Sequence, residues 1–228
     1  MKVNIKGVVK DIITDPNLLS DRSNEIDPRK EGTEVQQIVV DLKATMKANK
    51  LEYLTAPQIG YNKRIFCIKF GDSDYRTFIN PVIENVSNFH IARETCYSLP
   101  DKTFIRPRFG KCTIIYLTPL GKVEPRTILG RSAIVVQHCI DHLDGLLLED
   151  VGLEIDELFD NATDEERAEV IKAYLDALDI KQKDLEQEIQ QDEELKQIDD
   201  ATKFIHSVQT GETQLEQVTI SKEDIVEE

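Results

Sequence analysis

The chain has 228 residues, of which 40% are hydrophobic, and a formal net charge of −15 at pH 7. This length suffices for one sizeable core with an extension, while the acidic excess argues against a surface that grips nucleic acid. No apolar run approaches the length of a membrane span, and residues 1–9 lack the apolar core of a secretory signal, so we expect an intracellular protein. The four cysteines are scattered, which in a reducing compartment favours free thiols or metal ligands over a disulfide framework.

In chain order, the first predicted element is a helix. Apolar residues recur at helical spacing across residues 35–46, where they would form one packed face. Four later segments have the composition of strands: residues 64–70, 75–79, 82–86 and 111–117. Asn80-Pro81 ends the second of these segments, so we expect a separate strand after it.

A second, short and buried helix is predicted before Gly145. Ser132 stands where an N-cap residue would, and Gly145 stands where a helix-ending glycine would. His138 and His142 are four residues apart and therefore lie on one face of this helix, where both imidazoles can bind the same metal ion. The alternative is a pair of core or surface histidines without a ligand, which is the commoner meaning of this spacing taken alone.

The acidic excess belongs to the last third of the chain, since residues 151–228 hold 24 Asp and Glu against 7 Lys and Arg. The sequence from Thr163 to Glu166 is a capping box, and a helix of about 25 residues is expected to follow. Its apolar stripe consists of Ile171, Leu175, Leu178, Leu185 and Ile189, interrupted at Gln182. We expect the first half of the stripe to pack on the body of the protein. The residues after Gln190 are expected to form a flexible tail or a segment ordered by a protein partner.

Three stretches of the chain, taken together, resemble the signature motifs of a known family. They are residues 54–60 (Leu-Thr-Ala-Pro-Gln-Ile-Gly), residues 94–100 (Glu-Thr-Cys-Tyr-Ser-Leu-Pro) and residues 137–145 (Gln-His-Cys-Ile-Asp-His-Leu-Asp-Gly). The family is that of the peptide deformylases, whose motifs run G-L-A-A-x-Q-[IV]-G, E-G-C-L-S and Q-H-E-x-D-H. Three motifs in the right order are far more specific than any one alone.

The resemblance implies an α+β fold, in which mixed and antiparallel strands surround a central metal-binding helix. It covers about residues 1–165, which we expect to form a peptide deformylase-like domain. Residues 166–190 would then be a C-terminal helix, and residues 191–228 would be an acidic tail.

The resemblance also implies a metal centre. Cys96, His138 and His142 match the family's metal ligands, and a thiolate with two imidazoles is a donor set that suits one divalent ion, Fe(II) or Zn(II). Gln58 and the backbone N–H of Tyr97 match the groups that stabilise the oxyanion formed when a formyl carbonyl is attacked. The centre would therefore bind a cation and polarise a carbonyl.

Two further matches concern residues that would support the ligands. Asp141 matches the family acid beside the second histidine, and Arg108 falls where the family carries an arginine able to pair with it. Such a pair would fix the orientation of the ligands. The alternative is two unrelated surface charges.

The chain departs from the family at the residue that handles protons. The family has Glu directly after the first histidine ligand, where this chain has Cys139. That Glu takes a proton from the attacking water and delivers it to the leaving amine, and such a group contributes about 10²- to 10⁴-fold in rate. A cysteine is shorter, its ordinary pKa is about 8.5 instead of about 4.3, and its thiolate binds metal as readily as it moves a proton.

Smaller departures lie at the substrate groove that the resemblance implies. Tyr53 and Thr95 stand where the family has Gly, and Leu54 follows Tyr53 in the same motif. Added side chains at the two glycine positions are expected to narrow the groove or to block a close approach to the backbone.

The sequence therefore supports two hypotheses. In the first, which we favour, the chain is a deformylase-like metal-binding protein, catalytically impaired, that serves as a scaffold or binding module. In the second, it removes the formyl group from N-formylmethionine of nascent polypeptides, slowly, without a base or with another base such as Glu94. The family implies a cytoplasmic protein of a bacterium, or of a virus in a bacterial host, with no direct nucleic-acid or membrane binding.

Two other classes of enzyme fit less well. A zincin-like protease needs the same intervening Glu, and its third ligand lies elsewhere. A cysteine hydrolase built on Cys139 would need a histidine that is not occupied by metal.

Overall fold

The computed structural model describes residues 5–71 and 74–191. These residues divide into two units, one that ends at Ala162 and one that begins at Thr163. The α-helices are α1 (Gly32–Asn49), α2 (Gly130–Leu143), α3 (Leu148–Val151), α4 (Glu157–Asn161) and α5 (Asp164–Gln191). The strands are β1 (Tyr53–Thr55), β2 (Ile65–Phe70), β3 (Asp74–Cys96), β4 (Leu99–Leu117), β5 (Val123–Leu129) and β6 (Leu153–Ile155). Two short 3-10 turns are η1 (Pro16–Leu18) and η2 (Pro57–Ile59).

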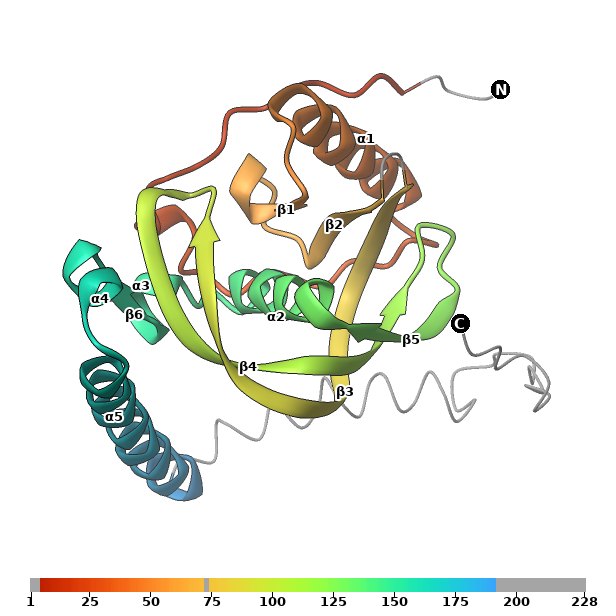
Figure 1. Ribbon diagram of the computed structural model, residues 1–228. Helices are drawn as coiled ribbons and strands as arrows, with labels where there is room; N and C mark the ends of the chain where they lie inside the picture. The colour runs from red at the N-terminus through yellow and green to blue at the C-terminus, as the bar shows by residue number, and fades with distance from the viewer. Residues whose placement is uncertain (1–4, 72–73, 192–228) are drawn as a thin grey trace. The chain divides into compact units, whose positions relative to one another are not determined.

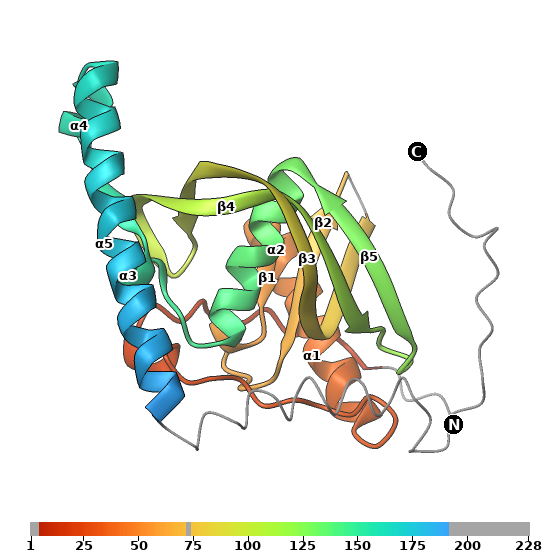
Figure 2. The ribbon, with the colours of Figure 1, turned by 90° about the horizontal axis from the view of Figure 1, so that it is seen from below.

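The named strands form one antiparallel sheet. Its order is β1-β2-β3-β4-β5, and β6 pairs with β4. The long strands β3 and β4 curve around α2 (Figure 1), and the second view shows the same helix inside the curve (Figure 2). The predicted α+β fold, with strands around a central helix, is confirmed.

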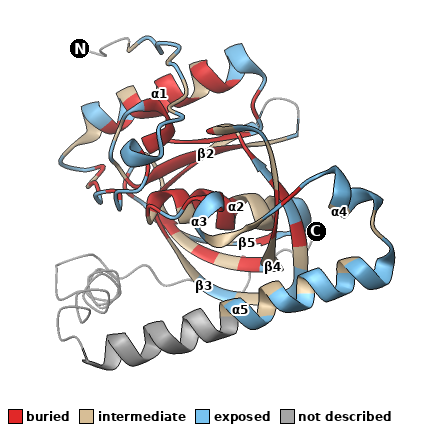
Figure 3. Cartoon of the chain, turned by 90° about the vertical axis from the view of Figure 1, so that its left-hand side faces the viewer, coloured by how far each residue is buried: buried red, intermediate tan, exposed pale blue. Residues whose placement is uncertain are grey.

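Helices α1 and α2 cover opposite faces of β1 and β2, because successive side chains of a strand point to opposite faces. In β2, Ile65 and Cys67 pack in the cluster that α1 covers, whereas Phe66 and Ile68 pack in the cluster that α2 covers. Both helices therefore turn buried faces toward the sheet (Figure 3). The helix predicted at residues 35–46 is confirmed as part of α1.

The prediction of two strands around Asn80-Pro81 was wrong, since β3 continues through both residues. The register of β3 against β4 shifts between Ile79 and Val82, and Asn80 has a positive φ of 46°. This irregularity admits Pro81, which has no N–H to donate to the ladder. As a result, one strand runs from the residues that pair with β2 to the candidate ligand Cys96.

The ends of α2 correct one prediction and confirm another. The helix begins at Gly130, directly after β5, and makes no side-chain cap, so the predicted N-cap Ser132 lies inside the first turn. Gly145 does end the helix, with φ of 75°, and its N–H donates to the carbonyl of His142 at 3.3 Å. The N–H of Leu146 donates to the carbonyl of Asp141, which completes a Schellman motif.

Helix α5 begins at the predicted capping box. The N–H of Glu166 donates to Thr163 Oγ1 at 3.2 Å, and the N–H of Thr163 donates to the Glu166 carboxylate at 2.8 Å. In the first half of the predicted stripe, Ile171, Leu175 and Leu178 are half-buried. The side chains of its second half and residues 192–228 lie outside the described residues, and the packing of the stripe stays a prediction. No helix among the described residues has the length and apolar character needed to span a membrane.

Candidate metal centre

Three predicted ligands meet where the end of β3 faces α2. Cys96 is the last residue of β3, and His138 and His142 lie one turn apart on α2. Their ligand atoms all lie within 4.8 Å of one another, and Cys96 Sγ is 3.1 Å from His142 Nε2. All three residues are at most 4% exposed. The fold thus gathers residues that are 46 positions apart in sequence into one buried cluster.

Glu94 orients the first histidine. It lies two residues before Cys96 on β3, so both side chains point to the same face of the strand. Its carboxylate lies 3.0 Å from His138 Nδ1 and accepts two hydrogen bonds from Arg108, at 2.6 and 3.1 Å. His138 Nε2 is buried without a hydrogen-bond partner, as is His142 Nδ1. The contact with Glu94 therefore leaves Nε2 of His138 free for a ligand.

Two arginines of β4 hold Asp141 of α2. Arg108 Nη1 lies 2.7 Å from the Asp141 carboxylate, which is the predicted pair, and Arg106 Nη1 donates to the same oxygen at 2.5 Å. Because residues 106 and 108 are two apart on a strand, their side chains share a face. Arg108 joins Asp141 to Glu94, so a chain of charged groups connects α2 with β3 and β4.

Buried hydrogen bonds set the protonation of the metal-free centre. Burial alone would raise the pKa of Cys96, but the nearby imidazoles of His138 and His142 outweigh it and lower that pKa to about 5. Burial would lower the pKa of His138, yet its contacts with Cys96 and Glu94 raise it to about 9. At neutral pH the metal-free centre therefore pairs a Cys96 thiolate with a protonated His138, and metal binding would require His138 to release its proton.

The residues present fit a divalent metal ion. They supply one thiolate and two imidazoles at short mutual distance. His138 Nε2 is buried without a hydrogen-bond partner, and His142 Nε2 faces Cys96 Sγ at 3.1 Å. This donor set matches the three-ligand zinc and ferrous sites of hydrolases, which keep a further position open.

The Gln58 amide lies beside the cluster and is held at both ends. Its Nε2 donates to Ser98 Oγ at 3.0 Å and lies 3.8 Å from Cys96 Sγ. Its Oε1 accepts hydrogen bonds from the N–H and the hydroxyl of Thr55, at 3.1 and 3.0 Å. The amide donor is thus held beside Cys96 Sγ by contacts at both of its ends.

Cys139 lies in the apolar core and not among the ligands. Its side chain is 0% exposed and packs in the cluster that also contains Tyr53, Val136 and Ile140. Burial, followed by the negative charge at Cys96, raises its pKa well above the ordinary value. The thiol is therefore neutral at physiological pH.

The three residues predicted at the substrate groove are placed differently. Tyr53 faces α2 and reaches the centre, whereas Leu54 points to the opposite face of β1 and is buried with α1. The Thr95 side chain is exposed, and only its carbonyl contacts Tyr53. One of the three side chains, that of Tyr53, is therefore brought to the metal ligands.

Sequence reasoning missed four supporting residues. Glu94 was considered only as a substitute base, and Arg106, Thr55 and Ser98 were not singled out. The two-residue spacing of Glu94 from Cys96, and of Arg106 from Arg108, was a usable signal, because strand residues two apart share a face.

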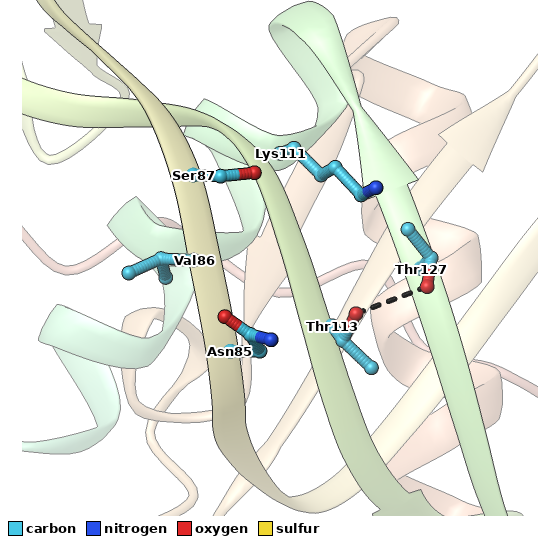
Figure 4. A pocket seen from close by; sticks show the side chains of 6 residues that line it. All are labelled: Asn85, Val86, Ser87, Lys111, Thr113 and Thr127. Carbon is cyan, nitrogen blue, oxygen red and sulfur yellow. Dashed lines mark hydrogen bonds between the residues drawn. The ribbon is translucent and has the colours of Figure 1, made fainter.

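A shallow hollow of about 220 Å³ lies away from the cluster, on strands β3, β4 and β5 (Figure 4). It is lined by Asn85, Val86, Ser87, Lys111, Thr113 and Thr127. Thr113 and Thr127 point away from α2, because their neighbours Cys112 and Ile128 pack against that helix. The hollow contains none of the predicted site residues.

Comparison with known proteins places this fold in one family. The profile of the family described as polypeptide deformylase matches residues 9–154. The peptide deformylase of Pelagibacter ubique (strain HTCC1062) is 36% identical over 148 residues, which cover 62% of this chain and 85% of the relative. A peptide deformylase structure from Legionella pneumophila has a TM-score of 0.58 at 25% identity and covers 77% of this chain and 98% of its own. A class I type b peptide deformylase structure from Acinetobacter baumannii, with a TM-score of 0.60 at 24% identity, covers 64% of this chain and 99% of its own and shows the fold alone.

Proposed function

This chain belongs to the peptide deformylase family, and from that premise we propose that it is a metal-binding member that has lost most or all of its hydrolytic activity. The family consists of metal-dependent hydrolases that act on N-formylmethionyl peptides. In our proposal the chain keeps the metal-binding part of that machinery and serves as a scaffold or binding module.

The observation that carries the proposal is the position of Cys139. The family's proton-transferring Glu is replaced here by a thiol that is fully buried in the apolar cluster. A general base must lie within hydrogen-bond reach of the proton that it takes, and its pKa should lie near the working pH. A neutral thiol among apolar side chains meets neither requirement.

Glu94 does not supply the missing base. Its carboxylate is paired with Arg108 and with His138, so both of its oxygens are engaged. Burial would raise the pKa of Glu94, but these hydrogen bonds outweigh it and lower that pKa to about 2. A carboxylate of this kind orients its neighbours and accepts protons poorly at neutral pH.

The remaining groups retain defined tasks. Cys96, His138 and His142 would hold Fe(II) or Zn(II), which when bound supplies Lewis acidity toward a carbonyl oxygen or water. Gln58 Nε2 would donate to a negatively charged oxygen beside the thiolate, and the Tyr97 N–H is proposed as the second donor. These groups favour the alternative function, a slow but active hydrolase for the formyl group of nascent polypeptides.

The test is the turnover of a formyl-Met-Ala-Ser peptide by the full-length chain loaded with Fe(II) and, separately, with Zn(II). Loss of the base predicts a rate at least about 10²-fold below that of an active relative measured alongside. Turnover comparable to the relative's would contradict the proposal and establish the alternative.

Two matched variants identify the cause of a low rate. Cys139→Glu restores a carboxylate at the proton-transfer position, whereas Cys139→Ser changes the same atom without adding a base. A gain for Glu and none for Ser would show that the base alone was missing. No gain for either would direct attention to Tyr53.

For the scaffold role we propose that the acidic extension binds a protein partner, because residues 151–228 hold 24 acidic against 7 basic residues. An acidic segment of this kind would be attracted to a protein partner with a basic surface. Binding that weakens with added salt and disappears on removal of residues 163–228 would support this assignment, and binding that survives the removal would contradict it.

A further inference from the structure

A tyrosine pair, Tyr53 and Tyr97, lies over the candidate metal centre. The Tyr53 ring meets His138 in a T-shaped contact, with ring centroids 5.3 Å apart, and packs on the Tyr97 ring at 4.9 Å. Tyr53 is 6% exposed, whereas Tyr97 is half-buried and Thr95 is exposed. The ligands therefore lie close beneath the surface, and the tyrosine pair forms a cover over them.

Both hydroxyl groups of the tyrosine pair bind backbone across the same gap. Tyr53 Oη donates to the Thr95 carbonyl at 2.8 Å, and Tyr97 Oη accepts a hydrogen bond from the Glu52 N–H at 3.2 Å. The two bonds run in opposite directions between the start of β1 and the end of β3. They fix both rings in place.

The backbone groups that the tyrosine pair occupies are those that an extended ligand would use. β1 is the terminal strand of the sheet order, and the end of β3 that carries Thr95 pairs with β4 but lies beyond the stretch that pairs with β2. Unpaired strand edges of this kind accept extended peptides through free N–H and C=O groups. Here the Glu52 N–H and the Thr95 carbonyl are already engaged by tyrosine hydroxyls. A peptide would have to break both bonds and displace the Tyr53 ring before it reached Cys96 or His138.

We propose that the tyrosine pair is a size filter, with Tyr53 as its specificity-determining residue. It admits ligands of the size of water or a small anion to the metal ligands and excludes extended peptides. This inference rests on the proposed function in one respect, because it specifies which ligands the impaired metal centre can still bind. Its prediction about how easily a reagent reaches Cys96 holds whatever the rate of hydrolysis.

The reactivity of the Cys96 thiolate measures access without metal. The full-length chain is treated with chelator and then with methyl methanethiosulfonate, a small reagent, or with a bulky aromatic maleimide. Modification of each cysteine is followed by peptide mass spectrometry, and rates are divided by those of a cysteine in an unstructured peptide. We expect the small reagent to modify Cys96 at least about 10-fold faster than the bulky one on this scale, since the bulky one must wait for the cover to open.

Two variants test whether Tyr53 is responsible. Tyr53→Ala is expected to raise the bulky-reagent rate at Cys96 by about 10-fold or more, and Tyr53→Phe, which keeps the ring and loses the bond to Thr95, by less. Cys67 is buried on the α1 face and is the internal control, because its rate should not change. Equal normalised rates of the two reagents in the unmodified chain, or an unchanged rate in Tyr53→Ala, would overturn the filter.

Unfolding is recognised separately. If Tyr53→Ala exposes Cys67 as well as Cys96, that variant is set aside. The filter is then judged from two results: the ratio of the small-reagent rate to the bulky-reagent rate at Cys96 in the unmodified chain, and the bulky-reagent rate in Tyr53→Phe. High turnover of a small formamide with a blocked Cys96 would refute the proposed function alone, whereas high turnover of a formylated peptide would refute both the proposed function and the filter. Low turnover with an accessible Cys96 would refute the filter alone.

Discussion

The two sides of the candidate metal centre differ in their chemistry. On the β3 and β4 side, Glu94 is paired with Arg108 and His138 in a buried polar network. On the β1 side, Tyr53 and Cys139 belong to one apolar cluster. The network would hold the His138 imidazole, while on the apolar side the residue at the family's proton-transfer position is the buried thiol of Cys139.

Binding a metal ion and using it in catalysis therefore place separate requirements on the residues around it. Burying charged groups costs several kcal/mol of desolvation, which only good pairing offsets. The chain nevertheless keeps Glu94 and Arg108 at 7% and 3% exposure beside the ligands. An apolar replacement would fill the same space at lower cost, so the buried pair beside the candidate ligands supports the proposed cation site.

The largest predicted effect comes from returning Cys139 and Tyr53 to the residue types that the family has at these positions. The variant Cys139→Glu alone should gain little turnover on a formyl-Met peptide, since Tyr53 still covers the ligands. Combined with Tyr53→Gly, it should gain about 10²- to 10⁴-fold, the usual contribution of a positioned general base. The control is Cys139→Ser with Tyr53→Gly. If that control gained as much as the Glu pair, access and not the base would be the missing element.

The second prediction concerns the stability of the metal-free network. Glu94→Gln should lower the free energy of unfolding by about 3 kcal/mol at pH 7, because it removes one partner of a buried ion pair. The folded-state pKa of Glu94 is about 2, below its ordinary value of 4.5. Its contribution is therefore fully present above pH 4.5 and is lost as the pH falls toward 2.

Urea unfolding at pH 7 and at pH 3 tests the sign of this effect. The difference between the unmodified chain and Glu94→Gln should be smaller at pH 3. The matched control is Glu84→Gln on the same strand, where the residue is exposed and the change should cost little. A difference that stays constant between the two pH values would show that Glu94 is not the titrating group.

The third and smallest prediction concerns the orientation of the ligands. Arg108→Met removes the guanidinium that contacts both Glu94 and Asp141, and it should weaken Zn(II) binding by about 10- to 100-fold. Competition with a chromogenic chelator gives the affinity. Lys111→Met, an exposed change on the same strand, serves as the control. Unchanged affinity in Arg108→Met would mean that the polar side is structural only.

Local patterns predicted helix α1 and the placing of His138 and His142 on one face of α2, while the role of Cys96 as a ligand came from the family resemblance and stays a prediction. The apolar period of residues 35–46 and the four-residue spacing of His138 and His142 need no knowledge of distant contacts. Gly145 was predictable for a similar reason, since a helix end with positive φ favours glycine. The pairing of Asp141 with Arg108 came from the family resemblance and not from spacing.

Features that depend on distant contacts were not predictable. Nothing near Tyr53 in the sequence shows that its hydroxyl reaches the Thr95 carbonyl, 42 residues away. The continuous strand β3 was missed because the bulge at Asn80 that admits Pro81 is set by its pairing with β4. Ser132 was predicted as an N-cap because propensity cannot show that β5 runs directly into α2.

X-ray absorption at the zinc edge, on the full-length chain loaded with one equivalent of Zn(II), tests the central claim most directly. Coordination by Cys96, His138 and His142 predicts one sulfur ligand at about 2.3 Å and two imidazole nitrogens at about 2.0 to 2.1 Å. Two sulfur ligands would place Cys139 on the metal, and a spectrum without sulfur would remove Cys96 from it. Either result would contradict the division between a side that binds the cation and a side that has lost its proton carrier.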